Sequence, residues 1–272
     1  MERSEITAAM ALLGAEQMRA AMIGDQILTP SLGIRIVRRA NLYCFSSTKI
    51  EEGVFNHVSG YGSFGEASQR SIDAVLRHYE RVGSVARFEV IVPGLSSAAL
   101  RLLRRNGFRD VATAFQCHVR TSARPPRAHA IDGLTIQRVR ARDAQDYTTL
   151  AARGFGEHRN RIGQVFERGW IRQIKRDPRV AAFIGSVDGT PAATGVTILR
   201  PTIAGLYSGS VLPKYRGRRI QNATIAARVA HGWARGLRTF YSWTDPESPS
   251  AHNLRDEGFR TLSELHIYRR EE

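Results

Sequence analysis

The stretch Ser210-Val-Leu-Pro-Lys-Tyr-Arg-Gly-Arg-Arg-Ile-Gln221 constrains the fold more than any other part of the chain. A β-rich run ends at Pro213, and a basic turn with glycine at position 217 follows. Apolar residues then recur at helical spacing, at Ile220, Ala223, Ala227, Ala230 and Ala234. The pattern predicts a strand, a short cationic loop and the N-terminus of a helix.

A helix N-terminus that follows a basic loop favours the binding of an anion. The first backbone N–H groups of a helix have no intrahelical partner, and the helix dipole adds positive potential at the same end. We therefore expect a phosphate or pyrophosphate group to bind at this loop. The glycine-rich segment 60–65 lacks the Gly-Lys-Ser/Thr signature of a phosphate loop, and we interpret it as a turn-rich connection.

The chain is strongly basic, with 40 Lys and Arg against 25 Asp and Glu in 272 residues, a formal net charge of +15. Two interpretations stay open. The protein belongs to an arginine-rich proteome, or it has an anionic partner such as a polyphosphate cofactor, a nucleic acid or an acidic substrate. The basic residues are scattered along the chain, so charge alone does not decide between them.

The cysteines and the N-terminus indicate an intracellular protein. Cys44 and Cys117 lie in apolar, strand-like surroundings, and we expect buried thiols in a reducing compartment. The N-terminus lacks a signal pattern, and no stretch approaches the ~20 apolar residues of a membrane span. We expect a cytoplasmic location and no membrane partner. The histidines show no metal-ligand spacing, so no metal cofactor is expected.

A Pro-Pro segment divides the chain into two halves that echo each other. We place the linker at 123–133, between domains at 1–122 and 134–272. Each half ends with a short helix, a Gly-Phe-Arg sequence and a strand, with the glycines at Gly107 and Gly258. Glycine at this place is typical of a left-handed helix C-cap. The repeated order indicates a duplicated unit.

The expected elements follow from periodicity and turn residues. The second half is predicted to read β-α-α-β-β-β-α-β-α-β, at 134–139, 143–153, 163–175, 180–187, 192–199, 203–211, 217–235, 239–244, 250–257 and 260–268. The first half is predicted to hold helices at 5–23 and 66–81, strands at 33–37, 42–45 and 88–92, and a glycine-rich loop at 55–65.

Two motifs in this order of elements resemble a known superfamily. Val211-x-Pro213-x-Tyr-Arg216-Gly217-Arg218-x-Ile220 resembles the acetyl-CoA-binding segment of the GCN5-related N-acetyltransferases (GNAT), Arg/Gln-x-x-Gly-x-Gly/Ala after a Val-x-Pro strand end. Glu247-x-x-Ser250-x-x-Asn253-Leu254-x-x-x-Gly258-Phe259 resembles the later helix that flanks the cofactor in that family. The resemblance implies an α/β (α+β) fold of tandem GNAT-like domains, each a mixed, mostly antiparallel sheet flanked by helices.

The resemblance places acetyl-CoA on the second domain, whereas the first is degenerate and lacks the CoA loop. The pyrophosphate is expected on the N–H groups of residues 216–221, and pantetheine alongside residues 210–212. An N–H near Ser210 or Val211 would face the thioester carbonyl. The implied cofactor-binding residues are Ser210, Val211, Leu212, Arg216, Gly217, Arg218, Arg219, Ile220, Gln221, Ser250 and Asn253.

The motif departs from the family pattern at two positions. Arg219 stands where the family usually has its second glycine, and Gln221 takes the final Gly/Ala position. Arg219 either adds a phosphate contact or crowds the pyrophosphate with its Cβ. We expect binding to be retained, because the rest of the segment is intact.

The catalytic groups are less well marked by the sequence. The helix before Gly258 carries no tyrosine to act as the usual acid, and the strand tyrosine Tyr207 is our candidate substitute. Glu157 and His158, in the loop after the first helix of the second half, are candidate bases. Other candidates are Tyr241, Tyr268, Asp245 and Glu247. Each tyrosine is also a plausible core residue, and Glu157-His158 a plausible solvated loop.

The expected activity is N-acetyltransfer, in which an acetyl group passes from acetyl-CoA to an amine acceptor. The alternative is a non-catalytic module that binds CoA or a nucleic acid. The sequence leaves open the acceptor, the preferred acyl group and the oligomeric state.

Overall fold

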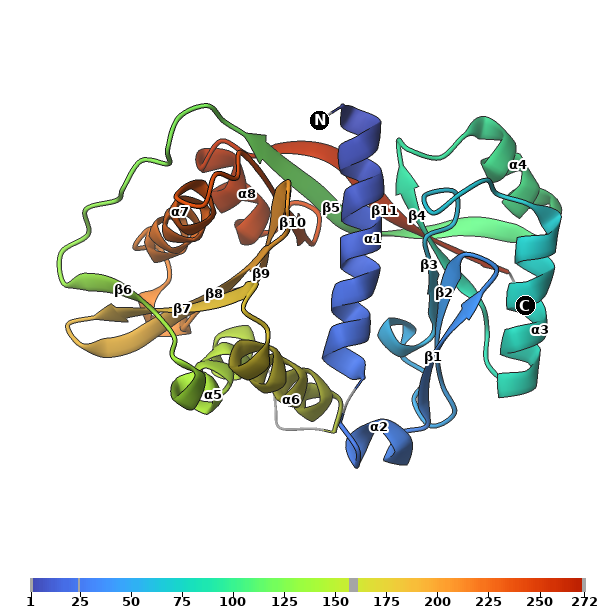
Figure 1. Ribbon diagram of the computed structural model, residues 1–272, viewed down its shortest axis with the longest axis horizontal. Coiled ribbons are helices and arrows are strands. Elements are labelled where there is room, and N and C mark those ends of the chain that lie inside the picture. The colour runs from blue at the N-terminus through green and yellow to red at the C-terminus, as the bar shows by residue number, and fades with distance from the viewer. Residues whose placement is uncertain (1, 24, 157–160, 271–272) are drawn as a thin grey trace. The chain divides into compact units, whose positions relative to one another are not determined.

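The computed structural model of the protein describes residues 2–23, 25–156 and 161–270 (Figure 1). The chain divides into two compact units. Unit 1 comprises Met1–Gln116 together with Leu262–Glu272, and unit 2 comprises Cys117–Thr261. In the described part of the chain, no helix combines the length and the apolar character that crossing a membrane requires.

Unit 1 is built on a sheet in the order β1-β2-β3-β4-β11. The β1–β2, β2–β3 and β4–β11 pairs are antiparallel, and β3–β4 is parallel. Its strands are β1 (Ile34–Arg39), β2 (Leu42–Ser47), β3 (His57–Ser59), β4 (Arg87–Val92) and β11 (Arg260–Arg270). Its helices are α1 (Arg3–Met22), α2 (Leu28–Ser31), α3 (Gln69–Val82) and α4 (Ser97–Arg105), with the 3-10 helix η1 (Gly53–Phe55).

Unit 2 is built on strands in the order β5-β10-β9-β8-β7-β6. The pairs from β6 to β9 are antiparallel, whereas β9 and β10 are parallel. Its strands are β5 (Phe108–Thr121, from Cys117 on), β6 (Leu134–Arg138), β7 (Val180–Val187), β8 (Thr190–Leu199), β9 (Ile203–Val211) and β10 (Thr239–Thr244). Its helices are α5 (Ala144–Phe155), α6 (Arg161–Arg176), α7 (Ile220–Trp233) and α8 (Pro249–Asp256), with η2 (Ala141–Asp143) and η3 (Pro213–Tyr215).

The helices of unit 2 cover the two faces of its sheet. Side chains that alternate along a strand point to opposite faces, and β9 follows this rule. Ala204 and Leu206 pack with α7 and α8, whereas Tyr207 packs with α5 and α6 (Figure 1). The two faces of β9 are thus held by different helix pairs.

Both units repeat one order of elements. β1-β2-β3-α3-β4-α4 in unit 1 matches β7-β8-β9-α7-β10-α8 in unit 2. The glycines after α4 and α8 are left-handed, with φ of 83° at Gly107 and 78° at Gly258. The phenylalanines that follow, Phe108 and Phe259, are buried. The predicted element order of the second half is therefore confirmed, as are the left-handed glycines predicted after the last helix of each half.

The compact units do not divide at the segment 123–133. Residues Cys117–Thr121 of β5 belong to unit 2, although they precede that segment, and β11 from Leu262 on belongs to unit 1. Each unit is thus completed by a strand from the other half of the sequence. The domain boundaries at 122 and 134 stay predictions about where the chain divides into independently folding parts.

Several sequence expectations need correction. The helix expected to start at Gly217 starts at Ile220, because Gly217 and Arg219 have left-handed φ values of 76° and 57°. The segment expected as a glycine-rich loop contains strand β3. The apolar stripe of α7 is only partly the buried one, since Ala230 is exposed. Cys44 and Cys117 are buried free thiols, as predicted.

Candidate functional site

The end of β9 carries a β-bulge. Val196 of β8 pairs with Tyr207, but Thr194 pairs with Ser210, so two residues of β9 lie opposite the single residue Gly195. One of the two, Ser208, has a left-handed φ of 48°. A bulge bends its strand and redirects the peptide groups near it. The backbone just before the basic loop is therefore turned out of the regular ladder.

The same end of β9 extends past its partner β10. Parallel pairing joins Ile203–Leu206 to Thr239–Ser242, whereas β9 continues to Val211. The pairing with β10 ends at Leu206, and the bulge follows after one more residue, Tyr207, which is still paired with β8. Strand backbone beyond the paired region offers N–H and C=O groups to an extended ligand that lies alongside it. Ser210 and Val211 occupy this end of the strand, and Leu212 follows directly after it.

Helix α5 contacts the bulge from one face of the sheet and holds it by a hydrogen bond. The Tyr147 hydroxyl and the Thr194 hydroxyl each donate to the carbonyl of Ser208, both at 3.3 Å. The hydroxyls of Thr194 and Ser210 lie 2.8 Å apart. The helix comes this close because Gly154 has no side chain; a Cβ there would lie 2.2 Å from Ser210 Oγ. Burial raises the pKa of Tyr147 to about 12, so the phenol stays a donor at neutral pH.

The basic loop is fastened by Arg216. Its Nε donates to the carbonyl of Val211 at 3.2 Å, and its Nη2 donates to the carbonyl of Gly154 at 3.0 Å. The guanidinium thus ties the loop to the end of β9 and to α5. Arg218 lies over the ring of Tyr215, 5.9 Å from its centre, and Arg218 and Arg219 are both exposed. These two side chains are therefore available to an anion.

Helix α7 begins with an uncapped N-terminus. Its N-cap residue is Arg219, and no described side chain caps its first N–H groups. The first helical hydrogen bond runs from the N–H of Ala223 to the carbonyl of Arg219, at 3.1 Å. The N–H groups of Ile220 and Gln221 precede that bond. A Cβ at Gly217 would have no described atom within 4 Å, so the turn is open on that side.

The equivalent helix in unit 1 differs in this respect. α3 follows β3 as α7 follows β9, but its N-cap Ser68 accepts a hydrogen bond from the N–H of Ser71 at 3.2 Å. In turn, the Ser71 hydroxyl accepts a hydrogen bond from the N–H of Ser68 at 3.3 Å. A capping box of this kind satisfies the donors that an anion would need. At these equivalent positions, unit 1 therefore has a capped helix N-terminus and unit 2 an uncapped one.

Helix α8 brings Ser250 and Asn253 beside α7. Its N-cap Ser248 accepts from the N–H of Ala251 at 3.2 Å, and Asn222 of α7 donates to the carbonyl of Asn253 at 3.4 Å. Ser250 and Asn253 are both half-buried. The two helices thus share a polar contact near the uncapped end of α7.

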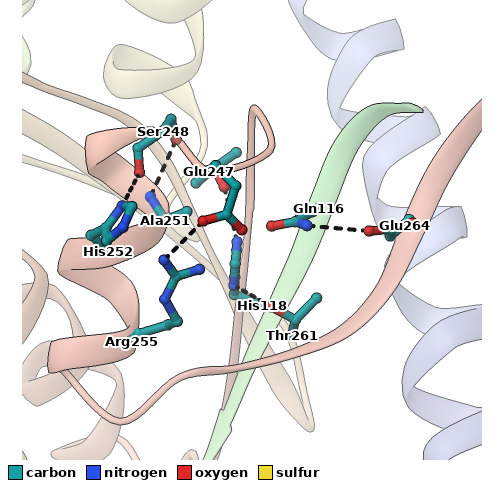
Figure 2. A network of polar contacts seen from close by, with 10 residues as sticks. Gln116, His118, Glu247, Ser248, Ala251, His252, Arg255, Thr261 and Glu264 are labelled. Atoms are coloured by element: carbon teal, nitrogen blue, oxygen red, sulfur yellow. Dashed lines mark hydrogen bonds and ion pairs between the residues drawn. The ribbon is translucent and has the colours of Figure 1, made fainter. Parts of the chain in front are cut away.

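The segment between β10 and α8 carries the charged residues Asp245 and Glu247, and Figure 2 shows Glu247 close to the buried histidine His118. Glu247, an exposed residue, accepts from Arg255 Nη2 at 3.4 Å. His118 of β5 is fully buried, and its ring contacts the hydroxyls of Thr244 at 2.9 Å and Thr261 at 3.3 Å. Burial and nearby Arg255 lower the pKa of His118, which favours the neutral ring. No local sequence signal marks His118, because it comes from the first half of the chain.

Tyr207 lies just before the bulge, but its phenol points into the packed layer under α5 and α6. Its hydroxyl is hydrogen-bonded to that of Tyr241, and both pKa values are raised, chiefly by burial. Gly205 makes room for both rings, since a Cβ there would lie 2.5 Å from Tyr207 and 2.7 Å from Tyr241. Both phenols are therefore neutral at physiological pH. Glu157 and His158 lie outside the described residues.

Among the residues that the structure describes, no group of three or more His, Cys, Asp or Glu is arranged to hold a metal ion. The polar groups described at the strand end and the basic loop are hydroxyls, backbone amides and arginines. Such a set suits an anionic organic ligand.

Comparison with known proteins shows the fold. No protein-family model and no curated protein matches the sequence. Among solved structures, a GCN5-related N-acetyltransferase from Kribbella flavida aligns at a TM-score of 0.61 and 12% identity, over 94% of this chain and 95% of that one.

Two further structures agree with this result. A GNAT-family protein from Novosphingobium aromaticivorans aligns at a TM-score of 0.51 and 18% identity, over 94% of this chain and 97% of the other. A tandem GNAT protein from the clavulanic acid biosynthesis pathway aligns at 0.59 and 11%, over 73% of this chain and 69% of its own. The chain therefore has the fold of the GCN5-related N-acetyltransferases, in its tandem form.

Proposed function

We propose that unit 2 binds acetyl-CoA and transfers the acetyl group to an amine. The observation that carries this proposal is one continuous feature, in which a bulged strand end that outruns its parallel partner leads through a basic turn into an uncapped helix. A thioester, a pantetheine arm and a pyrophosphate follow one another in acetyl-CoA, and this feature offers a matching partner to each.

The pyrophosphate would be held by backbone N–H groups between Arg216 and Gln221. Gly217 leaves the approach to them open, and Arg218 and Arg219 supply positive charge. Arg216 contributes by fixing the turn, because its guanidinium already binds two carbonyl groups. The anion would thus meet preorganised donors.

The pantetheine arm would lie along Ser210, Val211 and Leu212, where β9 extends past β10. Ser250 and Asn253 on α8 flank this path. An N–H near Ser210 or Val211 would then donate to the thioester oxygen and stabilise the negative charge that develops there.

The transfer also needs proton movements. The attacking amine must lose a proton, and the CoA thiolate gains one as the carbon–sulfur bond breaks. Tyr207 is protonated at neutral pH, which a proton donor requires, but its hydroxyl is committed to Tyr241. We keep Glu157, His158, Asp245 and Glu247 as candidate bases. Placing the amine beside the thioester would itself supply a large part of the rate.

Calorimetric titration of acetyl-CoA tests the cofactor site. Gly217→Glu places bulk and negative charge at the proposed pyrophosphate position. Gly236→Glu is the matched control, because Gly236 also has a positive φ, 86°, and open space around it, but follows the other end of α7. Wild type and the Gly236 variant should bind equally, and the Gly217 variant at least about tenfold more weakly.

The result that overturns the proposal is a folded wild type that does not bind, or a Gly217→Glu variant that binds like wild type. With binding established, CoA release in the presence of a panel of primary amines tests the transfer. Binding without any acceptor-dependent release would favour a non-catalytic CoA-binding module.

A further inference from the structure

Arg228 is a buried arginine on the face of α7 that packs against the sheet. It is 3% exposed, and burial lowers its pKa to about 10, so it remains charged at neutral pH. In the described parts of the chain, Tyr147 is the one ionisable group that affects the pKa of Arg228, and it raises that pKa. A buried charge without a carboxylate partner is costly, and such groups are often functional.

The guanidinium of Arg228 binds the bulge. Its Nε donates to the carbonyl of Thr224 in its own helix at 3.2 Å, and its Nη1 donates to the carbonyl of Tyr207 at 3.3 Å. Tyr207 is the last regularly paired residue before the bulge. The charged guanidinium therefore contacts the strand backbone close to where the thioester would bind.

Two glycines at the bulge leave space for this guanidinium. A Cβ at Gly195, opposite the bulge, would lie 2.7 Å from Nε of Arg228, and one at Gly209, in the bulge, would lie 3.2 Å from Nη2. The same position at Gly209 would be 3.0 Å from Nε2 of Gln221. Two side chains of α7, those of Arg228 and Gln221, thus approach the strand backbone where its residues are glycines.

Two consecutive carbonyl groups of the bulge are held from opposite faces. Arg228 holds that of Tyr207 from α7, while Tyr147 of α5 holds that of Ser208. A peptide group is planar, so fixing its carbonyl also fixes the N–H of the next residue, which points the other way. Hydrogen bonding to a cation further polarises the peptide group and strengthens that N–H as a donor.

We infer that Arg228 is a positioning residue for acyl transfer, which fixes and polarises the Tyr207–Ser208 peptide group at the start of the bulge and so sets the position of the following N–H groups, near Ser210 and Val211, that the proposed function assigns to the thioester carbonyl. The inference rests on the proposed function and adds to it the group that sets the polarity of the carbonyl-binding backbone.

Isotope-edited infrared spectroscopy of acetyl-CoA labelled with ¹³C at the carbonyl tests this directly, because it needs no acceptor. The carbonyl stretch of the labelled ligand should move to lower frequency on binding to wild type. Arg228→Met should bind acetyl-CoA within about threefold of wild type but lose most of that shift. Arg228→Lys keeps the charge with fewer donors and should give an intermediate shift.

Two further variants separate positioning from packing. Gly195→Ala keeps Arg228 but displaces its guanidinium, and it should reduce the shift as Arg228→Met does. Arg176→Met removes an exposed arginine of α6 and should leave the shift unchanged. If Arg228→Met does not fold, the lysine and alanine variants decide the question.

The outcomes distinguish the two proposals. A folded wild type that does not bind acetyl-CoA overturns the proposed function. A wild type that binds and shows the shift, with Arg228→Lys and Gly195→Ala showing the same full shift, overturns the role of Arg228 and leaves the cofactor site standing.

Discussion

The hydroxyl of Tyr147 donates to the carbonyl of Ser208, a residue with a left-handed φ of 48°, at 3.3 Å. A left-handed conformation is unfavourable for a residue with a Cβ and persists only where the surroundings hold it. The contact therefore links the stability of unit 2 to the shape of its strand end.

Tyr147→Phe should lower the free energy of unfolding by about 1 kcal/mol, because it removes one of two hydrogen-bond donors to the partly buried carbonyl of Ser208, while Thr194 still donates to it. Urea denaturation measures the change. Tyr43→Phe is the control, since this partly exposed hydroxyl has no hydrogen-bond partner among the described residues. Equal losses in the two variants would contradict the role assigned to Tyr147.

Gly205→Ala should destabilise the protein by about 2 kcal/mol, because the new Cβ meets two aromatic rings in a packed layer. Gly14→Ala should instead stabilise the protein, because Gly14 lies inside α1, where alanine favours the helix and no described atom lies within 4 Å of the new Cβ. Thermal unfolding compares them. A neutral Gly205 variant would show that the Tyr207–Tyr241 pair shifts easily.

The features that the sequence predicted are local ones. The strand, basic turn and helix at 203–233 were recognisable because each depends on neighbouring residues, such as Pro213 and Gly217. The helix ends at Gly107 and Gly258 were recognisable for the same reason.

The features that it did not predict depend on partners far apart in the chain. The bulge at Ser208 involves Gly195 on another strand and Arg228 on a later helix. Periodicity placed the small residues of α7 in one stripe, yet Arg228 is buried and Ala230 is exposed. His118 reaches unit 2 through a strand of the first half, which no local pattern reveals.

Arg219 stands where the GNAT motif that this sequence resembles has its second glycine, and its two open interpretations predict different affinities. Its side chain is exposed and its φ is 57°, so the turn already adopts the shape that glycine favours. We expect a phosphate contact, so Arg219→Ala should weaken acetyl-CoA binding about threefold to tenfold, more at low salt. Arg219→Gly should match the alanine variant in calorimetry. Tighter binding by the glycine variant would instead show that the Cβ crowds the pyrophosphate.

His231 on α7 makes the stability of unit 2 depend on pH. Burial, with Arg235 and Arg138, lowers the pKa of His231 from 6.5 to about 4. Arg235 also donates to its Nδ1 at 3.2 Å, which only the ring without a proton there accepts. Between pH 6.5 and 4, the unfolded chain binds a proton at this residue and the folded chain does not, so stability falls as the pH falls through this window.

His231→Gln should therefore reduce the loss of unfolding free energy between pH 7 and pH 4, because the variant has no group to titrate at this position. Urea denaturation at intervals of pH measures the slope for wild type and variant. The pKa values of His78 and His118 are also lowered, and both residues contribute equally to the two proteins. His252→Gln, a change on the exposed surface of α8, should keep the slope of wild type. If wild type and His231→Gln show parallel curves, the histidine is not held neutral in the folded protein.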